Sequence, residues 1–220
     1  MTAPPSRAET REAIALLVLT AIALVISGIG PRERGTWVLE VLPVLIAAPL
    51  LSFTWKPFRL TPLAYRLIFV HVLILMLGGH YTYAHVPLGF WLQEVFDFAR
   101  NPYDRIGHFA QGFVPAILVR EILLRSSPLG EGMRRGPSPS SAGKWMFFLV
   151  CCVALALSAF YEFIEWWVAL LFGQGAMEFL GTQGDPWDTQ WDMFLCLIGA
   201  IASQLLLSRF HDRQLARLAR

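Results

Sequence analysis

Three pairs of ionisable residues stand within otherwise apolar stretches of the chain. In each pair the two residues are three or four positions apart, a spacing that brings both side chains to one face of a helix. Ionisable groups are costly inside a lipid bilayer and usually mark a functional site there. The pairs are Asp104 with His108, Glu162 with Glu165, and Asp188 with Asp192. Their chemistry predicts a polar site built from carboxylates and one imidazole.

Several carboxylates in a medium of low dielectric constant repel one another. Protonation, an ion pair with Arg105 or a divalent cation would relieve this repulsion. Oxygen ligands with an imidazole suit Mg²⁺, Mn²⁺ or Ca²⁺, and Zn²⁺ or Fe²⁺ can also bind such a set. We therefore predict a divalent metal site with the ligands Asp104, Glu165, Asp188 and Asp192.

A structural network is the alternative interpretation of the same residues. Asp104 and Asp188 stand where helices should begin, and Asp is a common N-terminal cap. Buried glutamates could accept hydrogen bonds from Trp and Tyr side chains. Glu40, in another apolar stretch, and Glu121, next to Arg120, are interpreted as members of local pairs.

If the site is catalytic, we expect hydrolysis or group transfer on a lipid-linked or cell-envelope substrate. His108 or Glu162 would be the general base, and the metal would polarise a phosphoryl or carbonyl oxygen. Arg105, Gln111 and Trp187 are predicted to contact the substrate. No nucleophile elbow, H-E-x-x-H motif or P-loop supports a named enzyme class.

The composition indicates that membrane-spanning helices position these residues. Hydrophobic residues make up 55% of the 220 residues and charged residues 15%, with a mean hydropathy of +0.52. Soluble domains carry about 25% charged residues, and disordered chains are poor in apolar ones. The sequence therefore predicts one all-α membrane domain, a helix bundle of about six spans. The spans cover about residues 13–29, 36–54, 63–79, 105–124, 145–172 and 189–210.

Basic residues predict the orientation of the bundle. Lys and Arg gather on the cytoplasmic side of membrane proteins. With both termini in the cytoplasm, 14 of the 18 Lys and Arg residues fall in cytoplasmic segments. The three ionisable pairs then lie together near the periplasmic face. The net charge of +2 is too small to indicate a nucleic-acid partner, so membrane lipids are the expected contacts.

Two segments between the spans are distinctive. Residues 85–100 carry apolar side chains at helical spacing and are predicted to form an amphipathic helix at the membrane interface. Residues 126–143 are basic and rich in Gly, Ser and Pro, which predicts a flexible cytoplasmic loop. Cys151, Cys152 and Cys196 all fall inside spans, and their odd number argues against a disulfide framework.

Three motifs in order resemble the YjdF-like inner-membrane family, a bacterial family with a domain of unknown function. They are Tyr103–Phe113 (YDRIGHFAQGF), Tyr161–Trp166 (YEFIEW) and Gly181–Met193 (GTQGDPWDTQWDM). The resemblance covers most of the chain after the first span. It implies an inner-membrane location and no particular reaction.

A weaker likeness is to VanZ-like membrane proteins, which show an Asp-Lys/Arg-x-x-His-Phe motif and a later Asp-x-x-x-Asn-x-x-Gly motif. Asp104, Arg105, His108 and Phe109 match the first motif. Asp192 and Gly199 match the second, but Cys196 stands where Asn is usual. VanZ-like proteins are associated with glycopeptide tolerance, so this likeness implies a cell-envelope context.

Two further functions remain open at this stage. A small transporter or proton/cation pathway would use the carboxylates as transient ligands, although the acids gather in one leaflet and no inverted repeat is visible. A non-enzymatic structural or assembly protein is the other alternative. The sequence does not determine the substrate or the oligomeric state.

Overall fold

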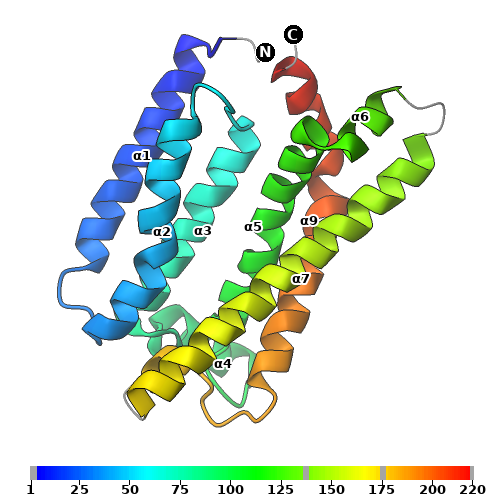
Figure 1. The fold of residues 1–220 in the computed structure, drawn as a ribbon. Helices are drawn as coiled ribbons and strands as arrows, with labels where there is room; N and C mark the ends of the chain where they lie inside the picture. Colours follow the sequence, from blue (N-terminus) through cyan, green and yellow to red (C-terminus); the bar gives the residue numbers. More distant parts are fainter. Residues whose placement is uncertain (1–3, 136–138, 174–176, 219–220) are drawn as a thin grey trace.

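The computed structural model describes residues 4–135, 139–173 and 177–218. The chain is all-helical, and six helices are long and apolar enough to cross a membrane, as predicted. These six are α1 (Arg7–Ser27), α2 (Arg34–Thr54), α3 (Pro62–Tyr81), α5 (Tyr103–Ser126), α7 (Pro139–Phe172) and α9 (Asp188–Leu218). Both ends of the described chain lie at the same end of the bundle (Figure 1).

Local signals explain where the first helices begin. Ser6 caps α1 in a capping box with Glu9, and the Glu33 carboxylate accepts hydrogen bonds from the backbone of Gly35 and Thr36 at the start of α2. Thr61 caps α3, and Pro62 occupies its first turn, where the missing N–H costs nothing. Each of these helices therefore starts at a residue that satisfies its free N–H groups.

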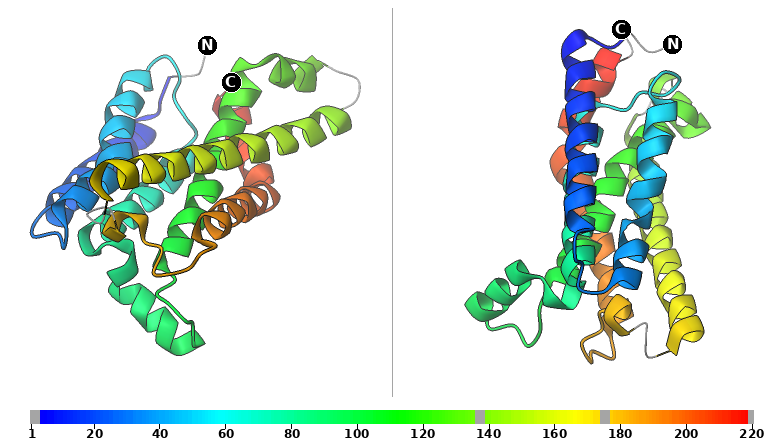
Figure 2. Two further views of the ribbon diagram at one scale, coloured as in Figure 1. Left: turned by 60° about the horizontal axis from the view of Figure 1, so that its bottom comes forward. Right: turned by 90° about the vertical axis from the view of Figure 1, so that its left-hand side faces the viewer.

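The spans form two groups. Helix α3 packs against α1 and α2, whereas α5, α7 and α9 pack against one another. Helix α3 also contacts α5 and thereby joins the groups. Helix α7 crosses the others obliquely, which Figures 1 and 2 show from different sides. The starts of α5 and α9 lie at the end of the bundle opposite to the chain termini (Figure 1).

The contact between α5 and α9 is the closest approach between two spans at the site. A Cβ atom on Gly112 would lie 1.7 Å from the carbonyl oxygen of Cys196, and one on Gly199 would lie 2.1 Å from that of Phe109. Only glycine fits at these points, as at other close crossings of membrane helices. The two backbones therefore touch one turn after His108 on α5 and two turns after Asp192 on α9.

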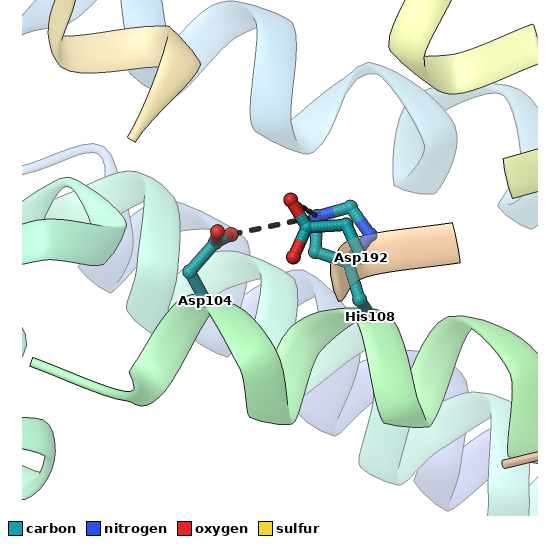
Figure 3. Close-up of side chains that lie close together, drawn as sticks. All are labelled: Asp104, His108 and Asp192. Carbon is teal, nitrogen blue, oxygen red and sulfur yellow. Dashed lines mark ion pairs between the residues drawn. The ribbon is translucent and has the colours of Figure 1, made fainter. Parts of the chain in front are cut away.

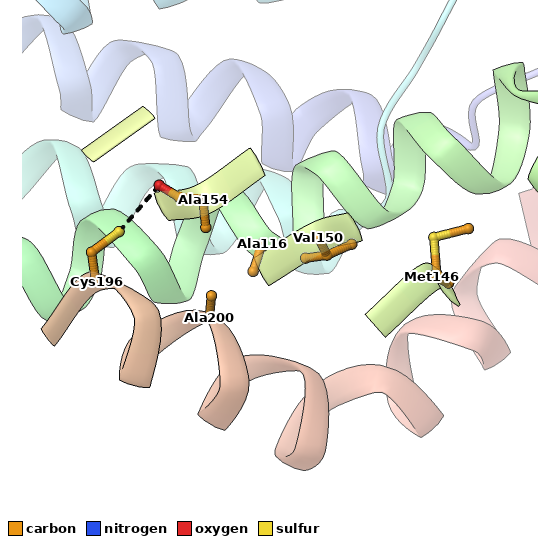
Figure 4. Packing of buried hydrophobic residues seen from close by; sticks show 6 residues of the cluster. All are labelled: Ala116, Met146, Val150, Ala154, Cys196 and Ala200. Carbon is orange, nitrogen blue, oxygen red and sulfur yellow. Dashed lines mark hydrogen bonds between the residues drawn. The ribbon is translucent and has the colours of Figure 1, made fainter. Parts of the chain in front are cut away.

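A small-residue core lies beside this crossing. Ala116 of α5, Cys196 and Ala200 of α9, and Val150 and Ala154 of α7 are buried together (Figure 4). The Cys196 thiol donates to the backbone oxygen of Ala154 at 3.5 Å. Short side chains let the three helices approach closely, so α7 is held against the α5–α9 pair.

A buried polar network joins α3, α5 and α9 near the chain termini. The Glu121 carboxylate accepts hydrogen bonds from the Thr61 backbone, from Arg125 at 2.6 Å and from His211 Nε2 at 3.1 Å. Arg120 donates to His211 Nδ1 at 3.1 Å. Since an Arg can only donate, Nδ1 of His211 is an acceptor and the proton is on Nε2. Glu121 thus pairs with Arg125 and His211 instead of its neighbour Arg120.

The two segments outside the spans differ from their predicted bounds. The predicted interfacial helix is shorter: α4 covers Pro87–Phe96 and ends at Asp97, whose φ of 53° is left-handed. Tyr83–His85 form a separate 3-10 turn, η1.

The segment predicted as a loop contains helix α6 (Pro128–Arg135), and α7 already begins at Pro139. A loop without helix over residues 126–143 was therefore the wrong expectation, because Pro128 can start a helix and Leu129 packs against the small-residue core. Residues 136–138 lie outside the described chain.

Candidate functional site

Asp104, His108 and Asp192 form the centre of the candidate site (Figure 3). The Nε2 atom of His108 lies 3.5 Å from Oδ1 of Asp104, one turn earlier on α5, and 3.8 Å from Oδ2 of Asp192 on α9. One ligand atom from each residue falls within 4.8 Å of the others, and all three side chains are buried. We call these three residues the triad.

Gln111 orients the imidazole of the triad. Its Oε1 atom lies 3.1 Å from Nδ1 of His108. A carbonyl oxygen only accepts, so Nδ1 donates and carries a proton. In a neutral ring, Nε2 then has a free lone pair directed at the two carboxylates. Metal-binding histidines are commonly held in this way, with the second nitrogen donating to a nearby oxygen.

Two glutamates of α7 lie beside the triad. Oε1 of Glu162 is 4.0 Å from Nδ1 of His108, and Glu165 is buried and interacts electrostatically with Glu162, Asp104 and His108. Oε1 of Glu162 and Oδ1 of Asp192 are buried and form no hydrogen bond among the described residues. Two acceptor atoms thus face the site without a donor, which is unusual for buried oxygens.

The acids around the triad lack a Lys or Arg partner among the residues that the structure describes. In the part of the chain that the structure describes, no salt bridge joins a Lys or Arg to Asp104, Asp192, Glu162 or Glu165. Among the described residues, His108 is the one basic side chain that forms an ion pair with them. Unpaired charges in a membrane interior are costly. The group therefore requires bound protons or a bound cation.

The nearby arginines are engaged by other acids. Arg100 forms an ion pair with Asp188 and lies 3.8 Å from Asp185. Arg105 donates to Asp185 at 3.2 Å, and its guanidinium lies 5.2 Å from the ring centre of Trp191. Asp188 is thus bound by an arginine and lies outside the triad, and Arg105 does not pair with the triad carboxylates.

The segment Gly181–Trp187 is docked onto the start of α5. Asn101 and Gln183 exchange two hydrogen bonds, in which the Asn101 N–H donates at 3.1 Å and the Gln183 amide donates at 3.0 Å. Arg100 also donates to the carbonyl of Thr182 at 2.6 Å. Gly181 has a φ of 62°, and a Cβ atom added to it would lie 3.8 Å from the Asp104 carboxylate. This docked segment therefore covers one side of the triad.

A fourth helix, α2, contributes an acid that sequence reasoning did not assign to the site. Glu40 of α2 is buried, and the Tyr161 hydroxyl donates to its Oε2 atom at 3.4 Å. The Tyr161 ring also lies edge-on to His108, with centroids 6.3 Å apart. Burial and, to a smaller extent, nearby Glu40 raise the pKa of Tyr83 in η1 well above its ordinary value, so its hydroxyl stays protonated. The sequence offered one signal that could have placed Glu40 in the site: it is an acidic residue inside an apolar span.

The structure thus brings together some of the predicted residues and separates others. Asp104, His108 and Asp192 meet, and Glu162, Glu165 and Gln111 lie beside them. Asp188 and Arg105 belong to the surrounding ion pairs, and Trp187 is exposed in the docked segment. Arg100, which the sequence did not single out, is the residue that binds Asp188.

Comparisons with known proteins agree with the first of the two resemblances. A family model described as "Predicted membrane protein (DUF2238)" matches residues 12–213. Inner membrane protein YjdF of Escherichia coli (strain K12) is 55% identical over 201 residues, which cover 91% of this chain and 90% of that protein. The likeness to VanZ-like proteins gains no support. No solved structure matches the chain.

Proposed function

The chain belongs to the DUF2238 family of predicted membrane proteins, whose description names no reaction, and on this basis we propose a function from the site itself. We propose that this inner-membrane protein binds a divalent cation between Asp104, His108 and Asp192. One observation carries the proposal: Nε2 of His108 lies within 4 Å of two buried carboxylates while Oε1 of Gln111 holds Nδ1.

The donor set indicates which cations fit. Ca²⁺ takes six to eight oxygen ligands, and Mg²⁺ keeps most of its waters, so neither prefers an imidazole. One imidazole with two or three carboxylates suits Mn²⁺ or Zn²⁺ better. The unpartnered Oδ1 atom of Asp192 supports a bound cation, because a cation would satisfy it. We therefore propose Mn²⁺ or Zn²⁺ ahead of Mg²⁺ and Ca²⁺.

The chemistry that we propose for the cation is hydrolysis or group transfer on a lipid-linked or cell-envelope substrate. In this proposal His108 is a ligand, so Glu162 is the general base that takes a proton from the attacking water. The water oxygen forms a bond to the phosphoryl or carbonyl centre as the bond to the leaving group breaks. The exposed indoles of Trp187 and of Trp191, the second of which lies beside the Arg105 guanidinium, support access from the lipid side.

A continuous pathway for protons or cations has less support. Between the triad and the Glu121 network, α5 passes through Gly112 and Ala116, and α9 passes through Cys196 and Ala200. All four are buried, and Ala116, Cys196 and Ala200 belong to the small-residue core. A transport pathway needs polar groups at successive depths, and on α9 the first buried polar side chains beyond Asp192 are Ser203 and Gln204, about three turns away.

Metal analysis of the purified protein tests the proposal. The wild type, loaded with Mn²⁺ or Zn²⁺ and desalted, should retain about one ion per chain by mass spectrometry of the elements. Asp192→Asn and His108→Ala should retain little, because each removes a ligand. Glu94→Gln is the control, since Glu94 is an exposed acid of α4 near the same end. Background metal in the wild type, or equal metal in all variants, would contradict the proposal.

A separate assay tests the reaction. Release of inorganic phosphate from vesicles of phosphatidic acid or from farnesyl diphosphate would be measured with the Mn²⁺-loaded wild type and with Glu162→Gln. We expect release that depends on the metal and is reduced about 100-fold or more in Glu162→Gln, the usual range for loss of a general base. Metal binding without release from either probe would contradict phosphoryl hydrolysis and leave the metal site standing.

A further inference from the structure

Two arginines converge on one carboxylate beside the triad. Arg100 precedes α5 and Arg105 lies in its first turn, and their Nη2 atoms are 3.8 Å and 3.2 Å from the same oxygen, Oδ2 of Asp185. Guanidinium groups placed around one oxygen are a common way in which proteins bind a carboxylate or a phosphate. We call Arg100 and Arg105 the arginine pair. It has the form of an anion site that a side chain of the docked segment occupies.

The arginine pair has hydrogen-bonding capacity that the protein does not use. Each guanidinium carries five N–H donors. The Nε atoms of Arg100 and Arg105 are buried and have no acceptor among the described residues. Buried donors in proteins nearly always find an acceptor, so these two N–H groups indicate that a group with more oxygens belongs beside the pair. A phosphate monoester has three acceptor oxygens, one more than a carboxylate.

The docked segment has contacts that hold it in place without Asp185. Gln183 and Asn101 exchange two hydrogen bonds, and Arg100 donates to the carbonyl of Thr182. The Asp185 side chain is 19% exposed, so a ligand can reach it from outside the bundle. Another anion can therefore replace its carboxylate at the arginine pair while the segment stays docked.

The arginine pair lies next to the triad. Arg105 follows Asp104 directly in the sequence, and Asp188, which Arg100 binds, is one turn before Asp192 on α9. An anion on the pair would thus lie within one or two helix turns of the triad, which is about 5–10 Å. The surrounding carboxylates repel a free anion, so we expect binding only when the triad holds its divalent cation.

We propose that the arginine pair binds the phosphate group of the substrate and that Asp185 occupies this place until the substrate arrives. The inference deepens the proposed function and rests on it, because the cation of the triad offsets the neighbouring acids. The ligand chemistry is that of a phosphate monoester or inorganic phosphate, which carries close to two negative charges at neutral pH. An uncharged carbonyl substrate would gain no ion pair from the two guanidinium groups.

Phosphorus NMR of inorganic phosphate with the Mn²⁺-loaded protein tests this proposal, because bound Mn²⁺ broadens the resonance of a phosphate held close to it. The wild type should bind phosphate and broaden its line. Asp185→Asn should bind phosphate about tenfold more tightly, since the competing charge is gone. Arg105→Gln should bind it about tenfold more weakly, the size expected for one charge-assisted hydrogen bond. Arg34→Gln is the control, because Arg34 is an exposed arginine at the start of α2, near the same end of the bundle (Figure 1).

A second arm of the experiment identifies the source of the phosphate group. Mixed micelles of phosphatidic acid and phosphatidylcholine would be added to the complex with inorganic phosphate. Competition by phosphatidic acid assigns the group to a lipid headgroup, and its failure to compete assigns the group to a soluble phosphate compound. Micelles of phosphatidylcholine alone are the control, since that lipid has no phosphate monoester.

The behaviour of Asp185→Asn separates an anion site from a structural latch. A latch predicts that this variant binds phosphate no more tightly than the wild type, and that result would overturn the proposal. Equal binding by Arg105→Gln and Arg34→Gln would overturn it too. Metal content would be measured in the same samples: full metal without phosphate binding contradicts the anion site alone, whereas a wild type without metal contradicts the proposed function as well.

Discussion

Nε2 of His108 on α5 and Oδ2 of Asp192 on α9 lie 3.8 Å apart, and two glycines make this approach possible. Gly112 packs against the backbone of Cys196, and Gly199 packs against the backbone of Phe109. Any larger residue at either point would push the helices apart. The triad therefore depends on residues that carry no functional group.

Gly112→Ala should destabilise the α5–α9 contact and weaken metal binding together. Its Cβ would lie 1.7 Å from a carbonyl oxygen, so the backbones must move. Overpacking of this kind costs about 1–3 kcal/mol. Thermal unfolding in detergent and Mn²⁺ retention would measure both effects. Gly143→Ala on α7 is the control, because its Cβ meets no atom within 4 Å. A stable Gly112→Ala protein with full metal content would contradict this account of the crossing.

Glu121→Ala should be strongly destabilising. Glu121 is fully buried and accepts hydrogen bonds from Thr61, Arg125 and His211. Removing it leaves these donors unpaired, at a cost of about 3–5 kcal/mol. Asp212→Ala is the comparison: Asp212 pairs with Arg120 but is 54% exposed, and such pairs contribute up to about 1 kcal/mol. Equal unfolding free energies for the two variants would show that the burial of Glu121 does not increase its contribution to stability.

Gln183→Ala should loosen the docked segment Gly181–Trp187 without unfolding the bundle. The change removes both hydrogen bonds with Asn101, worth about 1–3 kcal/mol in total. Hydrogen exchange should become faster in that segment and stay unchanged in α5. Gln190→Ala removes an exposed amide of α9 and should leave exchange as in the wild type. Unaltered exchange in Gln183→Ala would mean that other contacts hold the segment.

Cysteine labelling should establish the orientation that the basic residues predict. Arg32→Cys, between α1 and α2, should react with a membrane-impermeant maleimide in intact spheroplasts. Arg213→Cys, near the end of α9, should react only after permeabilisation. Both positions are exposed, and the native cysteines lie within α7 and α9. The reverse pattern would place the triad near the cytoplasmic face.

Several features of the fold could be predicted from local properties of the sequence. Hydrophobicity over about 20 residues depends only on neighbouring positions, so the six spans were identified correctly. Spacings of three and four residues identified Asp104 with His108 as one face of a helix, and these two side chains are in fact in contact. Helix α6 was missed, because Gly and Pro in its sequence indicate a loop unless Leu129 has a core to pack against.

Which acids meet was decided by the tertiary structure. Asp188 and Asp192 look equivalent in the sequence, one turn apart on α9, yet Arg100 binds the first and the second joins His108. The sequence by itself determined that acids and an imidazole gather near one end of six apolar helices. Only the packing of α5 against α9 at Gly112 and Gly199 decided which of them form the triad, because contacts between distant segments depend on how closely the backbones approach.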